Sequence, residues 1–360
     1  MDDAHFMTRA MANAASARLT VSPRPWVGAV VVTQDGSVAG DGATEGREGP
    51  HAEVVALRAA GERARGSTLY VTLEPCSHHG ATPPCTDAVV AAGIRRVVAA
   101  LEDPDRRVAG SGLARLRAAG IEVEVGTGGE EAARQLAPYL KHRRTGRPFV
   151  VLKLAASLDG RTAAPDGSSR WITGPEARRD VHRLRRESDA VLVGAGTVKA
   201  DDPELTVRLG GPEGAQPLRV VLGDIPAGAR VEPAISMKGE LGGVLDDLGG
   251  RGVLQLLVEG GARVAHDFHR LGLVDRYSIY LAPAFFGGDD ARPLFAGAGV
   301  PTISGLWRGR LAGVTRLGDD LRVDLEPLPG GDPLDDPLGE PGGGQTGNRQ
   351  ISDLPTESDR

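Results

Sequence analysis

The chain has 360 residues, of which 40% are hydrophobic and 25% charged, and its formal net charge is −6. This length favours two domains, because a single hydrophobic core stops growing at roughly 250–300 residues. The acidic charge excludes a bulk basic surface for nucleic acid, and we expect no signal peptide and no membrane span because the apolar runs are too short.

Residues 1–145 alternate apolar, β-rich runs with alanine-rich helical patterns. Strands are predicted at 27–33, 68–73, 97–101 and 121–125, and helices at 4–16, 53–65, 86–92 and 112–119. Such alternation is typical of an α/β layered sandwich. The turn-forming run Thr145-Gly146-Arg147-Pro148 follows, so we expect a first domain at 1–145 and a second that begins at residue 146.

Residues 146–328 repeat the alternation. Strands are predicted at 150–154, 190–193, 219–222, 254–258, 276–281 and 322–325, and helices at 175–186 and 261–271. Pro175 and Glu176 favour a helix start at this point. Residues 329–360 combine low hydrophobicity with glycine, proline and acidic side chains, which predicts a disordered tail.

Four residues of the first half predict a catalytic zinc site. His51, Cys76 and Cys85 supply one imidazole and two thiolates, and these cysteines are the two that the sequence contains. Three protein ligands leave the fourth tetrahedral position of zinc open for water, whereas a structural site is closed by a fourth ligand. Glu53 lies two residues after the histidine, where a carboxylate moves protons without binding the metal. Two cysteines are also too few for a disulfide framework, so we expect a cytoplasmic protein.

Each of these residues has a simpler interpretation when it is taken alone. His51 then caps a helix or lies on the surface, and the cysteines are small buried residues. Their order and the predicted strand and helix between them favour metal binding instead. Eight residues separate the thiols, so a longer loop is expected here than in the Cys-x-x-Cys deaminase pattern, with His78 and His79 as pocket walls.

Two glycine turns in the second half follow predicted strands. They are Gly194-Ala195-Gly196-Thr197 and Glu259-Gly260-Gly261, and glycines at strand ends allow backbone N–H groups to approach a phosphate. Most glycine turns of this kind bind no ligand, but two of them at strand ends in one α/β domain favour a site for an anionic ligand. Lys153 lies in an otherwise apolar strand, where it either contacts a substrate or marks an edge strand.

The run from Glu74 to Cys85, EPCSHHGATPPC, resembles the bifunctional riboflavin-biosynthesis deaminase/reductase family. The likeness covers about residues 1–328 and includes the Lys153–Arg161 and Ser169–Thr173 segments. It implies a cytidine-deaminase-like α/β/α sandwich followed by a dihydrofolate-reductase-like α/β domain. The implied reactions are the zinc-dependent deamination of a diaminopyrimidinone ribosylamino 5′-phosphate and the reduction of its ribose by NADPH.

The same resemblance implies site residues in the second domain. Substrate contacts fall on Lys153, Ser169, Arg185, Leu205, Arg208 and Glu259. NADPH contacts fall on Ala155, Trp171, Thr197, Asp201, Gly261, Ala262, Arg263, Val264, Ala265, His266 and Asp267. Arginine binds phosphate bidentately, so Arg185 and Arg208 are expected to hold the 5′-phosphate. Without the resemblance, Arg185 would be interpreted as part of the solvated face of an arginine-rich helix. Trp171 would be interpreted as a residue of the hydrophobic core.

One position departs from the family. Its Asn-Pro-x-Val-Gly turn reads Arg24-Pro25-Trp26-Val27-Gly28 here, and arginine does not accept a hydrogen bond as asparagine does. One alternative is therefore a reductase with a non-catalytic zinc domain or one of altered specificity. Another is a nucleotide-binding protein without turnover. We expect a phosphorylated pyrimidine as the small-molecule substrate, zinc and NADPH as cofactors, no nucleic-acid or membrane partner, and a homo-oligomer.

Overall fold

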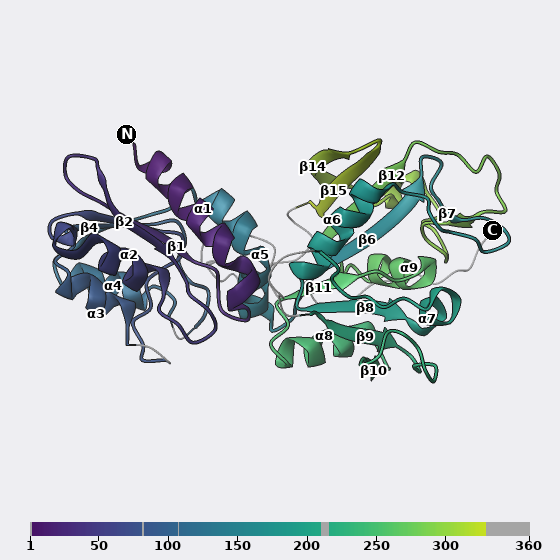
Figure 1. The fold of residues 1–360 in the computed structure, drawn as a ribbon, viewed down its shortest axis with the longest axis horizontal. Helices are drawn as coiled ribbons and strands as arrows, with labels where there is room; N and C mark the ends of the chain where they lie inside the picture. The colour runs from purple at the N-terminus through teal and green to yellow at the C-terminus, as the bar shows by residue number, and fades with distance from the viewer. Residues whose placement is uncertain (1, 81–82, 107, 210–215, 329–360) are drawn as a thin grey trace, which may run out of the picture. The chain divides into compact units, whose positions relative to one another are not determined.

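The computed structural model describes residues 2–80, 83–106, 108–209 and 216–328, which form helices packed on two main β-sheets (Figure 1). The predicted tail, 329–360, lies outside the described residues. Within the described ranges, no helix combines the length and the apolarity that a bilayer crossing requires.

The first sheet has the strand order β2-β1-β3-β4-β5. Its strands are β1 (Gly28–Val32), β2 (Val38–Ala43), β3 (Thr68–Val71), β4 (Arg96–Ala99) and β5 (Glu122–Val125). β1 runs antiparallel to β2 and β3, whereas β3, β4 and β5 are parallel. The four predicted strands are confirmed, and β2 was missed because glycines break its apolar pattern. Those glycines face α2: a Cβ on Gly40 would lie 2.5 Å from the Ala56 carbonyl oxygen.

Helices of the first half pack against this sheet. They are α1 (Asp3–Val21), α2 (Ala52–Ala60), the 3₁₀ turn η1 (Gly61–Ala64), α3 (Cys85–Ala91), α4 (Ser111–Ala118) and α5 (Gly129–Thr145). The buried core combines apolar side chains from the central strands and from the inner faces of α1, α2 and α5. α5 was not predicted because Pro138 and many charged residues obscure its pattern. Its C-cap is Gly146, which lies in the predicted turn.

The second sheet has the order β10-β9-β8-β11-β6-β12-β15-β14. Its strands are β6 (Phe149–Ser157), β8 (Ala190–Gly194), β9 (Leu218–Leu222), β10 (Ile235–Met237), β11 (Gln255–Val258), β12 (Arg276–Ala282), β14 (Gly309–Leu317) and β15 (Asp320–Pro327). In this order, the strands from β10 to β12 (β10, β9, β8, β11, β6 and β12) run parallel to one another. β15 pairs antiparallel with β12, and β14 pairs antiparallel with β15. β7 (Arg161–Ala163) and β13 (Arg292–Pro293) form a separate pair.

The helices of the second half are α6 (Pro175–Arg186), α7 (Ala195–Asp201), α8 (Leu241–Gly250) and α9 (Ala262–Arg270), with the 3₁₀ turn η2 (Ile303–Gly305). α6 has the predicted bounds. α7, α8, β7, β10, β13 and β14 were not predicted, because these segments are short, glycine-rich or largely exposed. In parallel strands the carboxyl ends meet at one edge of the sheet, and ligands bind there. The ends of β8 and β11 therefore carry the two glycine turns to the same edge.

Candidate active sites

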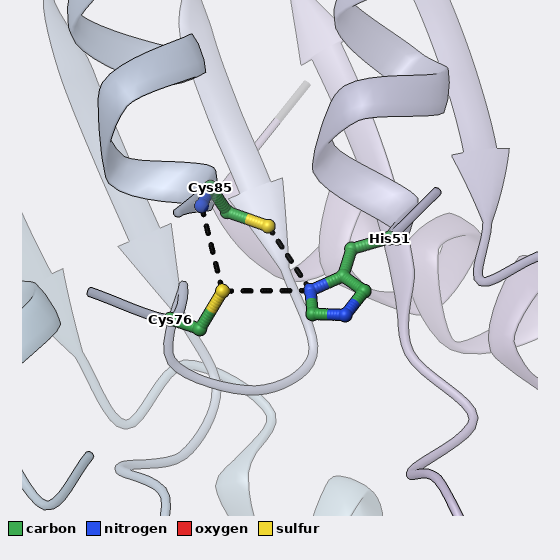
Figure 2. A group of neighbouring side chains, drawn as sticks. All are labelled: His51, Cys76 and Cys85. Carbon is green, nitrogen blue, oxygen red and sulfur yellow. Dashed lines mark hydrogen bonds between the residues drawn. The ribbon is translucent and has the colours of Figure 1, made fainter. Parts of the chain in front are cut away.

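His51, Cys76 and Cys85 come together at one end of the first sheet (Figure 2). Cys76 follows β3, Cys85 is the first residue of α3, and His51 is the N-cap of α2. The Nδ1 atom of His51 lies 3.1 Å from the Cys85 sulfur and 3.5 Å from the Cys76 sulfur. All three potential ligand atoms lie within 4.8 Å of one another. The structure thus joins residues that lie 25 and 34 positions apart in the chain.

This donor set fits zinc. With Zn–N near 2.0 Å and Zn–S near 2.3 Å, a tetrahedral angle places nitrogen and sulfur about 3.5 Å apart. The His51–Cys76 separation has this value and the His51–Cys85 separation is slightly shorter. The backbone N–H of Cys85 also donates to the Cys76 sulfur, at 3.4 Å. Among the described residues this trio is the one group of histidine, cysteine and acidic side chains placed to hold a metal.

Glu53 lies beside the trio in the first turn of α2, and its side chain is buried. Burial raises the pKa of the Glu53 carboxyl, and the attraction of His51 opposes this shift. A carboxyl group within reach of the reacting atoms can accept and donate a proton as a general base and acid. The position and burial of Glu53 are therefore suited to proton transfer next to a bound metal.

Arg24 lies near the same site. Its Nη1 group points at three carbonyl oxygens of the loop before His51, those of Gly46, Arg47 and Gly49, at 3.2, 3.0 and 3.0 Å. Burial lowers the pKa of Arg24, while the nearby acidic groups of Cys85, Cys76 and Glu53 oppose that shift. Arg24 thus holds the loop that leads to His51 and places a positive charge near the three predicted zinc ligands.

The second site is a cavity of about 1370 Å³ at the carboxyl edge of the second sheet. This exceeds the roughly 300–1,000 Å³ of a pocket for one small ligand, so there is room for a dinucleotide and a substrate together. The two glycine turns meet here, because the N–H of Gly261 donates to the Thr197 hydroxyl at 3.1 Å. The cavity lining includes the predicted residues Lys153, Ala155, Ser169, Trp171, Arg185, Thr197, Asp201, Leu205, Arg208, Glu259, Gly261, Ala262, Arg263 and Val264.

The remaining three predicted cofactor residues do not line this cavity. Ala265 is fully buried in the core under α9. His266 lies 3.0 Å from the Ala298 carbonyl oxygen, and Asp267 is next to it on the exposed side of the helix. Their assignment as cofactor contacts stays a prediction.

Lys153 and Glu259 form the polar centre of the cavity. β6 lies between β11 and β12, so the edge-strand interpretation of Lys153 is wrong. Burial lowers the pKa of Lys153, with the charge of Glu259 opposing it. Burial alone would raise the pKa of Glu259, but Arg185 and then Lys153 bring it below its ordinary value. The ion pair with Arg185 therefore favours the ionised form of Glu259.

The two arginines expected to bind phosphate already have carboxylate partners. Arg185 forms a two-point ion pair with Glu259, at 2.5 and 2.9 Å, and donates to the Thr206 carbonyl oxygen. Arg208 pairs with Glu204. Their assignment as phosphate ligands stays a prediction, since both guanidinium groups are paired with carboxylates in this structure.

Sequence reasoning missed Arg178 and His182, which also line the cavity from α6. Together with Arg185 they have helical i, i+4 and i+7 spacing, which was the available signal. The guanidinium of Arg178 lies 4.6 Å from the ring centroid of Trp171, and the N–H of Arg208 donates to the His182 Nδ1 atom at 3.2 Å. Trp171 is 69% exposed, so its interpretation as a core residue is wrong.

Fold and sites together define a two-part α/β enzyme: a zinc-dependent deaminase of the cytidine-deaminase type joined to a dinucleotide-dependent reductase. The family profile "Cytidine and deoxycytidylate deaminase zinc-binding region" matches residues 1–101. The profile "RibD C-terminal domain" matches residues 148–323.

Whole-chain comparisons agree. The chain is 40% identical to the riboflavin biosynthesis protein RibD of Escherichia coli, over 90% of this chain and 99% of that protein. It is 46% identical to the RibD protein of Mycobacterium tuberculosis, over 85% and 92%. A solved structure of Acinetobacter baumannii RibD superposes with a TM-score of 0.85 at 39% identity, covering 91% of this chain and 99% of that one.

The chain belongs to the RibD family of bifunctional riboflavin-biosynthesis enzymes. The expected fold class, the deaminase and reductase activities and the use of zinc and NADPH are thereby confirmed, and binding without turnover is excluded. The domain bounds 1–145, 146–328 and 329–360 stay predictions.

Proposed function

We propose that the chain deaminates 2,5-diamino-6-ribosylamino-4(3H)-pyrimidinone 5′-phosphate and then reduces its ribosyl group to a ribityl chain. The likeness to a Thermotoga maritima protein of known structure, a diaminohydroxyphosphoribosylaminopyrimidine deaminase/5-amino-6-(5-phosphoribosylamino)uracil reductase, supports these substrates. That protein is 35% identical to this chain and superposes with a TM-score of 0.82, over 90% of this chain and 98% of that one.

In the deaminase, His51, Cys76 and Cys85 would hold zinc. When bound, zinc acts as a Lewis acid that lowers the pKa of a water molecule to about 7. The Glu53 carboxylate accepts the proton that the attacking water loses and delivers it to the departing amino group. Water thus replaces the amino group on the ring carbon, and ammonia leaves. The single observation that carries this proposal is buried Glu53 beside a three-donor cluster of zinc geometry.

In the reductase, bound NADPH would be the source of the hydride that reduces C1′ of the opened ribose, and a proton from solvent would complete the reduction. Trp171, Thr197 and the turn at Gly261 position the cofactor, while Lys153, Arg185 and Glu259 orient the phosphorylated chain of the substrate. The protein contributes positioning and charge. A cavity with room for two ligands supports a complex in which cofactor and substrate are bound side by side.

The test replaces Glu53 with glutamine. The E53Q variant should release no ammonia from the diamino substrate, keep its zinc and oxidise NADPH at the wild-type rate with the deaminated substrate. The last measurement controls for folding within the same chain. Ammonia release that survives E53Q contradicts the proposed role of Glu53.

A second candidate is an active reductase whose zinc domain takes a different amine. The position of Arg24, near the thiolates and Glu53, favours it. Separate assays of ammonia release and of NADPH oxidation, with the diamino and the deaminated substrate, distinguish the two. Turnover of the deaminated substrate alone favours the second candidate.

We also propose a homo-oligomer and a cytoplasmic location. β14 is the outer strand of its sheet, and Leu311 and Val314 on it are 59% and 55% exposed. Apolar side chains on an unpaired edge favour burial against a partner. Light scattering after chromatography tests this: the wild type should be larger than one chain, and a L311D/V314D double variant should be a monomer.

A further inference from the structure

Glu74 is a buried carboxylate two residues before Cys76, and the reaction described above does not use it. Among the described residues, four backbone N–H groups donate hydrogen bonds to its side chain, at residues 103, 110, 112 and 113. Oε2 accepts from Asp103 at 3.1 Å and from Gly110 at 2.9 Å. Oε1 accepts from Gly112 at 2.8 Å and from Leu113 at 3.2 Å.

These bonds complete the start of α4. The N-cap residue of that helix is Gly110, which has no side chain to bond the free N–H groups of the first turn. A helix leaves its first N–H groups without internal partners, and its N-terminus attracts negative charge. Glu74 supplies that capping charge from the loop after β3, so the loop and the helix are fixed to each other.

The loop on both sides of Cys76 lies against α4. A Cβ on Gly112 would lie 1.9 Å from the Pro75 carbonyl oxygen, so the helix backbone packs directly on the residue before the cysteine. On the other side, the hydroxyl groups of Ser77 and Ser111 lie 2.7 Å apart. Cys76 itself accepts the Thr86 N–H at its carbonyl oxygen, at 3.2 Å.

We propose that Glu74 is a positioning residue of the deaminase, which sets the place of the Cys76 sulfur by tying the ligand loop to the first turn of α4. This inference rests on the proposed role of Cys76 as a zinc ligand. Glu74 acts through the backbone and touches neither the metal nor the substrate. The loss of its carboxylate should therefore alter zinc binding, while the rest of the chain stays folded.

The test is Glu74→Gln in the full-length enzyme. The amide keeps the length of the side chain, but its NH₂ group faces two of the four N–H donors and cannot accept from them. Outer partners of metal ligands are worth roughly 10–100-fold in metal affinity, so we expect zinc affinity to fall at least 10-fold. The absorption bands of the cobalt-substituted protein should shift, because they report the geometry around the thiolates.

The control is Glu62→Gln, the same change at an exposed position of η1. It should keep the zinc affinity and the cobalt spectrum of the wild type. In both variants NADPH oxidation with the deaminated substrate should stay at the wild-type rate. A folded E74Q protein with wild-type zinc affinity and cobalt spectrum overturns the proposal.

If E74Q does not fold, hydrogen exchange on the wild-type protein tests the proposed role of Glu74. Removal of zinc should speed amide exchange at Gly112 and Leu113, since the ligand loop then holds the helix start less firmly. Equal exchange with and without zinc overturns the proposal. Neither zinc affinity nor exchange depends on turnover, so an E53Q enzyme that still releases ammonia would refute the role of Glu53 and leave that of Glu74 standing.

Discussion

The carboxylate of Glu259 forms a two-point ion pair with the guanidinium of Arg185, at 2.5 and 2.9 Å. Both side chains are mostly buried, with 8% and 12% exposed. The pair joins the end of β11 to α6 and forms part of the cavity wall. It is therefore both a structural contact and part of the predicted substrate site.

Replacement of Glu259 by glutamine should destabilise the reductase. A charge left without its partner in a buried site costs about 3–5 kcal/mol. Chemical denaturation should therefore show that the free energy of unfolding falls by about 3 kcal/mol. Turnover of the deaminated substrate should also be weaker. Ammonia release should persist. The control E176Q removes an exposed pair with Arg179 and should cost less than about 1 kcal/mol. Equal losses in the two variants would refute this prediction.

Removal of zinc should separate the two activities. The predicted ligands lie between residues 51 and 85, whereas the residues that line the reductase cavity begin at Lys153. After treatment with a chelator, ammonia release should stop and NADPH oxidation with the deaminated substrate should continue. Added zinc should restore the first activity. If chelation stops both reactions at once, the assignment of zinc to the deaminase alone is wrong.

Gly28 is needed where β1 meets α1. A Cβ there would lie 1.9 Å from the Ala10 carbonyl oxygen and 2.6 Å from the Ala14 nitrogen. Both are backbone atoms of a helix that cannot move aside, so G28A should cost about 1–3 kcal/mol or more. The control G243A, in α8 with no atom within 4 Å, should stabilise by about 0.5–1 kcal/mol. Calorimetry of the two variants tests the contrast.

Asp103 should make stability depend on pH. Burial raises its pKa to about 6, from an ordinary value of 3.8, although the Tyr139 hydroxyl and the Asp105 N–H donate to it. The folded state then binds the proton more tightly than the unfolded state. Stability from this group is fully present below about pH 4 and is lost as pH rises to about 6, by roughly 2–3 kcal/mol.

The D103N variant should lose this pH dependence. Denaturation midpoints measured between pH 4 and pH 7 should change less than those of the wild type, and a control variant at exposed Asp289, D289N, should follow the wild type. A D103N curve parallel to the wild type over this range would show that Asp103 does not carry the effect.

Local patterns were sufficient for much of the fold. α6 has its predicted bounds because Pro175 marks the start and the helical spacing of apolar residues continues to Arg186. β2 and α8 were not predicted, since glycine weakens their local signal and their stability comes from packing on other elements. The inward direction of Arg178 and His182 depends on which face of α6 meets the sheet, and a solvated arginine-rich helix has the same composition.

For the deaminase, the sequence by itself determined the chemistry: one imidazole, two thiolates and a carboxylate of the types that an open zinc site requires. Only the tertiary structure decided that His51 and Cys85, 34 residues apart, lie 3.1 Å from each other. Donor types are properties of single residues and can be identified along the chain. Distances between them arise from the way β3, α2 and α3 pack around a shared core, which depends on contacts between segments far apart in sequence.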